Sequence, residues 1–539
     1  MKRIFLIAVL MISIASMAQE IKTNTPNPFC AAKYANDVII KSDPNIDQRG
    51  VKLAVAFNGW LYAAYSTDSI GSKGGITIRT SRDNGVTWTT IDSYFPAGID
   101  YPAFDIVVAG TDTNNLTLFL VGVNHNISAN TYVLYVDKYN ATTFVATGGI
   151  YSENKGTQKV YDISMATDYR FPAMGASPYS VAFAYSINNS NDSINYVASV
   201  DAGATWGVKE NIATTDRFFR KVSLAYGQSY NYSNGRYFAA WEQYSTYGSR
   251  NAHIYTSRTT PYINSPWVTP VNLDSLDAGM INLCRNPSMA VQFDTTDNDS
   301  SAVTAVVLMD RDYNGAGVDY DLLGFYNKRA TTSGSNHWHY LQVNNNTPEN
   351  DMTADITYDP FYNNFLVTYY DSTDQKLPYV VNNVNLTMAN PNSWTVITSQ
   401  YNDNPNLTAP YPRVEINPVM NQAAHAWNAN GTGTNGVAMF DAEYAIPISV
   451  QEVSQGIDHI SVYPNPVTDN FNISMKAKSS DAIAINVLDL TGKIVFTQNA
   501  SVNEGDNLIN VNAGMLAAGI YVVNIHGTSV NTNIKIIVR

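Results

Sequence analysis

A short, mostly apolar run recurs seven times between Trp60 and Asn428, at intervals of about 60 residues. The runs are WLYAAYS from Trp60, LTLFLVGV from Leu116, SVAFAYS from Ser180, RYFAAWE from Arg236, AVTAVVLM from Ala302, NFLVTYYD from Asn364 and QAAHAWN from Gln422. Each run follows another strand-like stretch across a polar turn and precedes a third and usually a fourth. Four short strands per repeat are typical of a propeller blade, so the pattern predicts an all-β, seven-bladed β-propeller.

The eight tryptophans agree with this register, because they fall into two places of the repeat. Trp60, Trp241 and Trp427 lie on the second strand of their repeats. The others open a fourth strand and are Trp88, Trp206, Trp267, Trp338 and Trp394.

The seventh repeat lacks an outer strand. The stretch NDVIIKSD at residues 36–43 precedes the first repeat and has strand character. We expect it to complete the seventh blade, close the ring and bury Val38, Ile39 and Ile40, since open propellers leave strand edges unpaired.

The two ends of the chain differ from the repeats. Lys2 and Arg3, an apolar core at residues 4–15 and Ser16-Met17-Ala18 predict a signal peptide over residues 1–18. The propeller is then expected over 19–445, a linker over 446–457 and a small C-terminal β-sandwich over 458–539. After the signal peptide no segment is long and apolar enough to span a bilayer, so the mature chain is expected to lack a transmembrane segment.

Composition narrows the partners and cofactors. Only 14% of residues are charged, there are 36 tyrosines, and the net charge is -13. A negative surface disfavours nucleic acid as a partner. No phosphate-binding or dinucleotide motif supports an organic cofactor. Cys30 and Cys284 could pair in an oxidising compartment or remain free thiols.

The C-terminal segment contains ISVYPNPVTDNFNI, INVLDLTGKIVF, AAGIYVVNI and a terminal NIKIIVR. This series resembles the C-terminal sorting domain of the type IX secretion system of Bacteroidetes. The resemblance implies a β-sandwich that the type IX machinery recognises, and a chain that is secreted or attached to the outer-membrane surface. Release and attachment both stay open.

Two repeats carry an S-x-D-x-G-x-T-W motif between their third and fourth strands. Its residues are Ser81, Asp83, Gly85 and Trp88 in SRDNGVTW, and Ser199, Asp201, Gly203 and Trp206 in SVDAGATW. The aspartate can accept hydrogen bonds from turn amides, the glycine permits positive φ, and the tryptophan packs on the blade. The motif resembles the Asp-box, or BNR repeat, of sialidases and many other propellers, and is expected to be structural.

The sialidase resemblance implies an arginine triad, a tyrosine activated by glutamate, and an acid. The usual F-R-I-P run is missing, but Arg49, Arg220, Arg285 and Arg413 lie near the starts of inner strands. Tyr411 and Glu415 would share one strand face with Arg413. These six residues are the catalytic candidates, and salt bridges lining the channel are the other interpretation.

One loop has the oxygen ligands of a calcium site. Asp310, Asp312, Asn314 and Asp321 occupy positions one, three, five and twelve of DRDYNGAGVDYD, with glycine at six. Calcium is therefore a possible cofactor, and a solvated acidic hairpin is the alternative.

Three functions remain open. The first is a non-catalytic module that binds a glycan or protein at one mouth of the channel, where rigid blades present loops. The second is an exo-acting glycoside hydrolase of sialidase-like type. The third is an envelope or matrix protein without a discrete small ligand.

Overall fold

The chain divides into two compact units, Met1–Tyr444 and Ala445–Arg539. The computed structural model describes residues 33–34, 37–41, 46–69, 72–110, 116–168, 179–188, 192–215, 218–228, 235–244, 252–260, 266–276, 284–293, 303–312, 320–331, 337–343, 350–383, 394–403, 407, 410–420, 422–430, 436–444, 457–463, 467–489, 493–517, 519–527 and 531–538. Apart from one 3-10 helix, η1 (Asp274–Leu276), the regular elements of these residues are strands. The predicted signal peptide and Cys30 lie outside the described residues.

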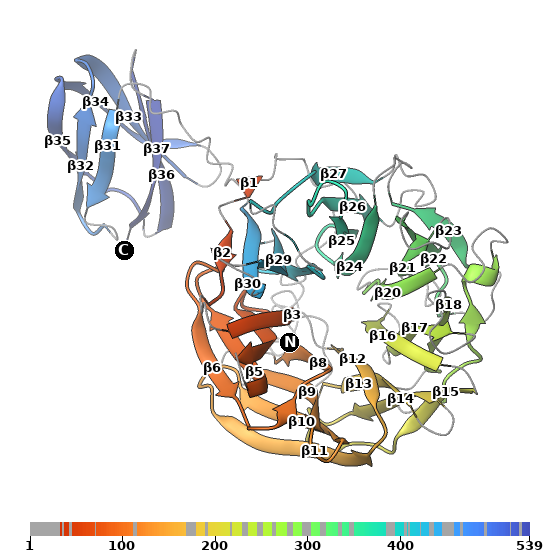
Figure 1. Cartoon of the computed structure of the whole chain (residues 1–539). Coiled ribbons are helices and arrows are strands. Elements are labelled where there is room, and N and C mark those ends of the chain that lie inside the picture. The colour runs from red at the N-terminus through yellow and green to blue at the C-terminus, as the bar shows by residue number, and fades with distance from the viewer. Residues whose placement is uncertain are drawn as a thin grey trace, which may run out of the picture. The chain divides into compact units, whose positions relative to one another are not determined.

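The strands of the first unit form successive blades around a central channel (Figure 1). Blade one is β3 (Ile46–Val55), β4 (Leu61–Ser69), β5 (Ser72–Ser81) and β6 (Thr89–Tyr94). Blade two is β7 (Ile99–Asp100), β8 (Phe104–Ala109), β9 (Thr117–Asn126), β10 (Thr131–Asn140) and β11 (Ala146–Gly156). Blade three is β12 (Val160–Thr167), β13 (Val181–Ile187), β14 (Asp192–Ser199) and β15 (Glu210–Thr215).

The remaining blades follow the same order from the channel outward. Blade four is β16 (Phe218–Gly227), β17 (Arg236–Tyr244), β18 (Ala252–Arg258) and β19 (Val271–Asn272). Blade five is β20 (Cys284–Val291), β21 (Ala305–Asp312), β22 (Tyr320–Asn327) and β23 (His339–Gln342). Blade six is β24 (Asp351–Asp359), β25 (Asn364–Asp371), β26 (Tyr379–Asn383) and β27 (Thr395–Thr398). Blade seven is β28 (Arg413–Asn417), β29 (Gln422–Asn430) and β30 (Gly436–Tyr444), with β1 (Lys33–Tyr34) and β2 (Val38–Ile39) at its outer edge.

This arrangement confirms the predicted all-β propeller, and its sheets are consistent with seven blades. The second strand of each blade lies between neighbouring blades, so both of its faces are buried. Every residue of β13 and β25 is buried, for example. A strand buried on both faces is a continuous apolar run rather than an alternating one, which explains the repeat seen in the sequence.

The N-terminal strands close the ring. Val38 pairs with Phe440 and Ile39 with Met439, and the Ile40 amide donates to the Ala438 carbonyl at 3.0 Å. The prediction that this stretch completes the seventh blade is therefore confirmed. The expected burial of all three apolar residues was wrong, because an outermost strand turns one face to solvent: Ile40 is 2% exposed, whereas Ile39 is 47% exposed.

Both Asp-box turns fold as compact hydrogen-bonded loops. The Gly85 amide donates to Ser81 Oγ at 2.8 Å, and the Thr87 amide donates to Asp83 Oδ1 at 2.9 Å. Gly85 has φ 90° and Trp88 Nε1 donates to its carbonyl at 3.0 Å.

The second Asp-box repeats the hydrogen bonds that the serine and the aspartate accept in the first. Ser199 Oγ accepts from the Gly203 amide at 2.9 Å, and Asp201 Oδ1 accepts from the Thr205 amide at 2.8 Å. Hydrogen bonds from the Thr205 side chain and amide hold the pKa of Asp201 down at about 2. Trp206 packs on Phe183 of its own blade and on Tyr151 of blade two, so the turn helps to hold these two blades together.

Strand direction separates these turns from the channel-facing candidates. Successive strands of a blade are antiparallel, so the inner strands begin at the end opposite to the turns between third and fourth strands. We call the end at which the inner strands begin, near Arg49, Arg220, Arg285 and Tyr411, the inner-strand mouth. The two Asp-boxes lie at the other end.

The second unit is a two-sheet sandwich. One sheet contains β31 (Ile457–Tyr463), β32 (Asn470–Ala477) and β35 (Gly505–Asn512). The other contains β33 (Asp481–Leu488), β34 (Ile494–Val502), β36 (Gly519–His526) and β37 (Asn531–Val538). Alternate residues such as Phe471, Ile485 and Val523 form its core. In the part of the chain that is described, no helix has the length and apolar character of a membrane span.

Candidate functional site

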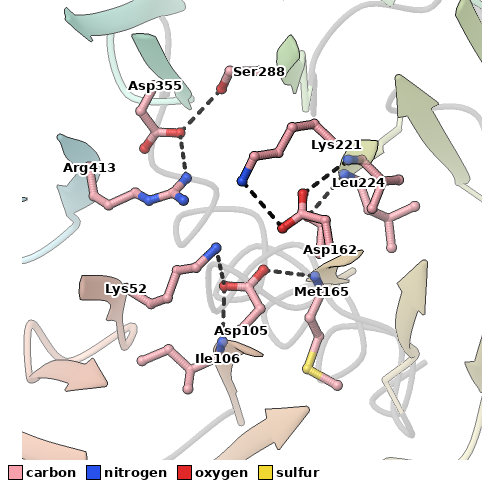
Figure 2. A network of polar contacts seen from close by, with 12 residues as sticks. Lys52, Asp105, Ile106, Asp162, Met165, Lys221, Leu224, Ser288, Asp355 and Arg413 are labelled. Atoms are coloured by element: carbon pink, nitrogen blue, oxygen red, sulfur yellow. Dashed lines mark hydrogen bonds and ion pairs between the residues drawn. The ribbon is translucent and has the colours of Figure 1, made fainter. Parts of the chain in front are cut away.

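The inner strand of each blade contributes at least one polar or charged side chain to the channel wall. We call seven of these side chains, one from each blade, the channel ring; they are Lys52 of β3, Asp105 of β8, Asp162 of β12, Lys221 of β16, Ser288 of β20, Asp355 of β24 and Arg413 of β28. Figure 2 shows them turned toward one another around the channel.

Bulges help to aim the ring side chains into the channel. The pairing of β3 with β4 shifts between Arg49 and Lys52, and Gly50 at the shift has φ 62°. The inner strands of blades five and six shift in the same way just before Ser288 and Asp355. A bulge inserts one residue into a strand and redirects the side chains beside it.

The six charged members of the ring form three ion pairs between neighbouring blades. Lys52 Nζ lies 3.6 Å from Asp105 Oδ1, and Lys221 Nζ lies 3.7 Å from Asp162 Oδ1. Arg413 Nη1 lies 3.3 Å from Asp355 Oδ1. Three cations thus face three carboxylates, so the formal charge of the ring cancels.

Each ring carboxylate also binds a backbone amide of the next blade. Asp105 Oδ2 accepts from the Met165 amide at 2.8 Å (Figure 2). Asp162 Oδ2 accepts from the Val222 amide at 3.1 Å, and Asp355 Oδ2 from the Val414 amide at 3.0 Å. Removing such a carboxylate would leave both a cation and an amide without their partner. The three aspartates therefore tie the inner strands of adjacent blades together.

The ring cations differ in how firmly they hold their protons. Burial, together with the charge of Arg413, lowers the pKa of Lys52. The carboxylate of Asp162 raises the pKa of Lys221. Burial by itself would lower the pKa of Arg413. The charges of Asp355 and other carboxylates outweigh this effect, so the pKa of Arg413 is raised. Lys221 and Arg413 are thus fixed positive charges at the channel wall.

The cavity inside the ring is small. Its volume is about 90 Å³, well below the roughly 300–1,000 Å³ of pockets that enclose small ligands. It has room for a few waters but not for a sugar ring, so a ligand on this axis would contact one of the two channel mouths.

The structure gives each predicted arginine a separate local partner. Arg49 pairs with Asp47 and its side chain is 68% exposed. The guanidinium of Arg220 stacks on Tyr161, 3.9 Å from the ring centroid. That of Arg285 stacks on Tyr320 at 3.8 Å, with Asp310 at 3.7 Å. Of the four, Arg413 alone lines the channel cavity.

The structure also separates the three residues that were expected to share one strand face, Tyr411, Arg413 and Glu415. Tyr411 lies before β28 begins and has φ 40°, so regular strand alternation does not extend to it. It lines the cavity beside Arg413, is 42% exposed, and has Lys221 Nζ 5.7 Å from its ring centroid. Glu415 accepts a hydrogen bond from Thr357 of blade six at 3.2 Å.

The predicted calcium ligands lie on different faces of a hairpin. Asp321 pairs with Arg311, so it points to the face opposite Asp310 and Asp312, which flank Arg311 on the same strand. Asn314 lies outside the described residues. Within the described ranges, no group of three His, Cys, Asp or Glu side chains could hold a metal ion.

Asp310 instead belongs to a buried carboxylate cluster beside the channel. Its Oδ2 accepts from Asn286 Nδ2 at 2.6 Å and its Oδ1 from the Thr353 amide at 2.8 Å. Glu242 accepts from the Asn286 amide at 2.5 Å. Burial raises the pKa of both carboxyl groups, that of Asp310 to about 7.

Sequence interpretation missed most of the channel ring. Lys52, Asp105, Asp162, Lys221 and Asp355 were not among the candidates. A signal was present, since each lies in the strand-like stretch that precedes an apolar run. The ring position holds lysine, aspartate, serine or arginine in different blades, however, so no common residue type marks it along the chain.

A known protein family matches the second unit of the chain. Residues 461–539 match the family model described as a secretion system C-terminal sorting domain. A search of curated proteins found no match to this sequence.

Solved structures resemble the propeller at a distance. An α-L-arabinanase of Penicillium chrysogenum is 12% identical at a TM-score of 0.44, over 76% of this chain and 98% of that one. A protein of unknown function from Dyadobacter fermentans is 11% identical at a TM-score of 0.43, over 78% of this chain and 100% of that one. The NanB sialidase of Streptococcus pneumoniae is 12% identical at a TM-score of 0.37, over 78% of this chain and 71% of that one. Likenesses this distant carry no inference about activity, whereas the family match shows that the C-terminal unit of this propeller protein is a secretion system C-terminal sorting domain.

Proposed function

We propose that this protein is exported by the type IX system and acts as a non-catalytic binding module on the cell surface or after release. The sorting domain at residues 461–539 supports the route. The ligand is a glycan or a segment of another protein, and it contacts the inner-strand mouth.

The charged side chains of the channel ring pair with one another, and this observation favours a binding role over a catalytic one. Electrostatic catalysis needs charges that are held ready for the reacting group rather than for each other. Here Arg413 pairs with Asp355 and Lys52 with Asp105, while Arg220 and Arg285 stack on tyrosines. These groups stabilise the blades.

An exposed aromatic ring at the mouth supplies a surface for a ligand. Tyr411 is 42% exposed at the edge of the cavity, with the cation of Lys221 beneath it. Aromatic faces stack on sugars and peptides and lose little conformational entropy in doing so.

A glycan array probed with the mature chain, beside a fluorogenic sialoside assay, tests this function. We expect a bound glycan class, no turnover, and an affinity that falls about fivefold in Tyr411→Ala, as the loss of one stacking contact of about 1 kcal/mol predicts. Tyr463→Ala is the matched control, because Tyr463 is 47% exposed but belongs to the sorting unit. Equal loss of affinity in both variants, or sialoside turnover, would contradict the proposal.

A further inference from the structure

A second cavity lies between blade one and blade two, away from the channel ring. Its volume is about 440 Å³, within the roughly 300–1,000 Å³ range of pockets that hold small ligands. Strands β5 and β6 form one wall, and β9, β10 and β11 form the other. Its lining is rich in tyrosine and contains two carboxylates, and it includes no lysine or arginine among the described residues.

Two polar groups in this wall lack protein partners. Tyr101 is 5% exposed, and no described residue hydrogen-bonds its hydroxyl group. The same holds for the buried side-chain oxygen of Asn124. A buried polar group without a partner costs stability, so such groups beside a cavity indicate a site for a polar ligand.

The two carboxylates of the wall are hydrogen-bond acceptors. Asp92 is held in place by Tyr139 Oη at 3.0 Å and by the Ser93 amide at 2.8 Å. Asp137 has no hydrogen-bond partner among the described side chains and amides, and burial together with the charge of Asp92 raises its pKa. With two acidic groups and no cation in the wall, an anionic ligand would be repelled.

Bulges and glycines shape the cavity. The pairing of β10 with β11 shifts at Asp137 and again at Tyr139. Gly148 has no atom within 4 Å of the position that a Cβ would occupy. At the rim, Tyr94 is 57% exposed and presents a flat aromatic face.

We propose that this cavity is a second binding site, for a neutral saccharide of about one or two sugar units. Sugar hydroxyl groups donate to Asp92, Asp137 and the Asn124 carbonyl oxygen, and a sugar oxygen accepts from Tyr101. The apolar face of the sugar ring packs on the tyrosine rings of the wall. This site is separate from the inner-strand mouth and does not depend on what binds there.

Isothermal titration of the mature chain tests the site. The probes are methyl β-D-glucopyranoside, methyl β-D-galactopyranoside and maltose, with N-acetylneuraminic acid as the acidic comparison. We expect at least one neutral probe to bind and the acidic one not to bind. Tyr101→Phe should weaken binding about three- to tenfold, and Asp137→Asn about tenfold or more.

Thermal melting separates a binding role from a structural one. Because the Tyr101 hydroxyl has no described partner, Tyr101→Phe should melt no lower than the wild type while its affinity falls. Tyr463→Phe, in the sorting unit, should change neither quantity. The site is overturned if no neutral probe binds at millimolar concentration, if Tyr101→Phe and Asp137→Asn both bind as well as the wild type, or if the acidic sugar binds equally well. None of these results affects the assignment of the channel mouth, which Tyr411→Ala tests.

Discussion

Trp88 of the first blade and Phe440 of the seventh meet edge to face, with their ring centroids 5.3 Å apart and their planes at 68°. Phe440 also pairs with Val38 of the N-terminal strand, and a Cβ on Gly85 would come within 1.9 Å of its ring. The first Asp-box turn and the N-terminal strand therefore hold the last blade at the same residue.

Replacing Gly85 with alanine should destabilise the propeller by about 3 kcal/mol. Its φ of 90° strains any side chain, and the added methyl group overlaps Phe440. Gly98→Ala is the matched control, since Gly98 has φ 73° with nothing within 4 Å of its Cβ position. We expect it to cost only about 1 kcal/mol. Denaturant titration of both variants measures the difference, and equal losses would show that the contact with Phe440 is unimportant.

The closing strand should contribute to stability through Ile40 and very little through Ile39. Ile40→Ala removes a side chain that is 2% exposed and should cost about 3 kcal/mol. Ile39→Ala removes one that is 47% exposed and should cost less than about 1 kcal/mol. Chemical denaturation compares them.

Truncation tests the same strand more severely. A chain that begins at Val51 lacks the partner of β30 and should aggregate, whereas one that begins at Thr25 should behave normally. Equal solubility and equal melting temperature of the two truncated chains would argue against a closed ring.

Deleting residues 456–539 should leave the propeller folded but hold it in the periplasm. The deletion removes the sorting domain, and the first unit has its own core and closure. Fractionation of cells followed by immunoblotting locates the protein, and protease resistance reports its folding. Efficient secretion of the shortened chain would contradict the assigned role of this domain.

We expect no hydrolysis of fluorogenic sialosides by the wild-type protein. The guanidinium groups of Arg49, Arg220 and Arg285 have separate local partners, and Arg413 is paired with Asp355. Turnover that disappears in Arg413→Ala, and in variants of the other three arginines, would instead establish a sialidase-like hydrolase.

The buried carboxyl group of Asp310 should make stability fall as pH rises. Burial raises its pKa from the ordinary 3.8 to about 7 in the folded chain. The unfolded chain therefore loses this proton first, and the folded state loses stability between about pH 4 and pH 7. Asp310→Asn should flatten the dependence of melting temperature on pH across this window. An unchanged slope would assign the dependence to other groups.

The sequence was informative where both faces of a strand are buried. Runs such as SVAFAYS and NFLVTYYD repeat because every residue of β13 and β25 is buried, so most of their positions are apolar or small. The closure of the ring was also predictable, since an incomplete last repeat and a spare first strand complement each other. Asp-box turns depend on local chemistry and could be identified from their residues.

The channel ring was less predictable because its pairs join residues far apart in the chain. Nothing local relates Lys52 to Asp105 or Asp355 to Arg413. The bulges beside Lys52 and Asp355 also shift the alternation of their strands by one residue. Arg220 and Arg285 seemed suited to a shared site, but each stacks on a tyrosine whose neighbourhood only the folded chain creates.

Closure by the N-terminal strand fixes the order in which the protein can mature. The strands Lys33–Tyr34 and Val38–Ile39, which leave the ribosome early, pair with β30, whose last residue is Tyr444. The N-terminal strands therefore lack their pairing partner until β30 has been synthesised. Completion of the fold thus follows the arrival of the whole propeller in one compartment. If the chain crosses a membrane as an extended polypeptide, the N-terminal strands and β30 can pair only after the crossing is complete.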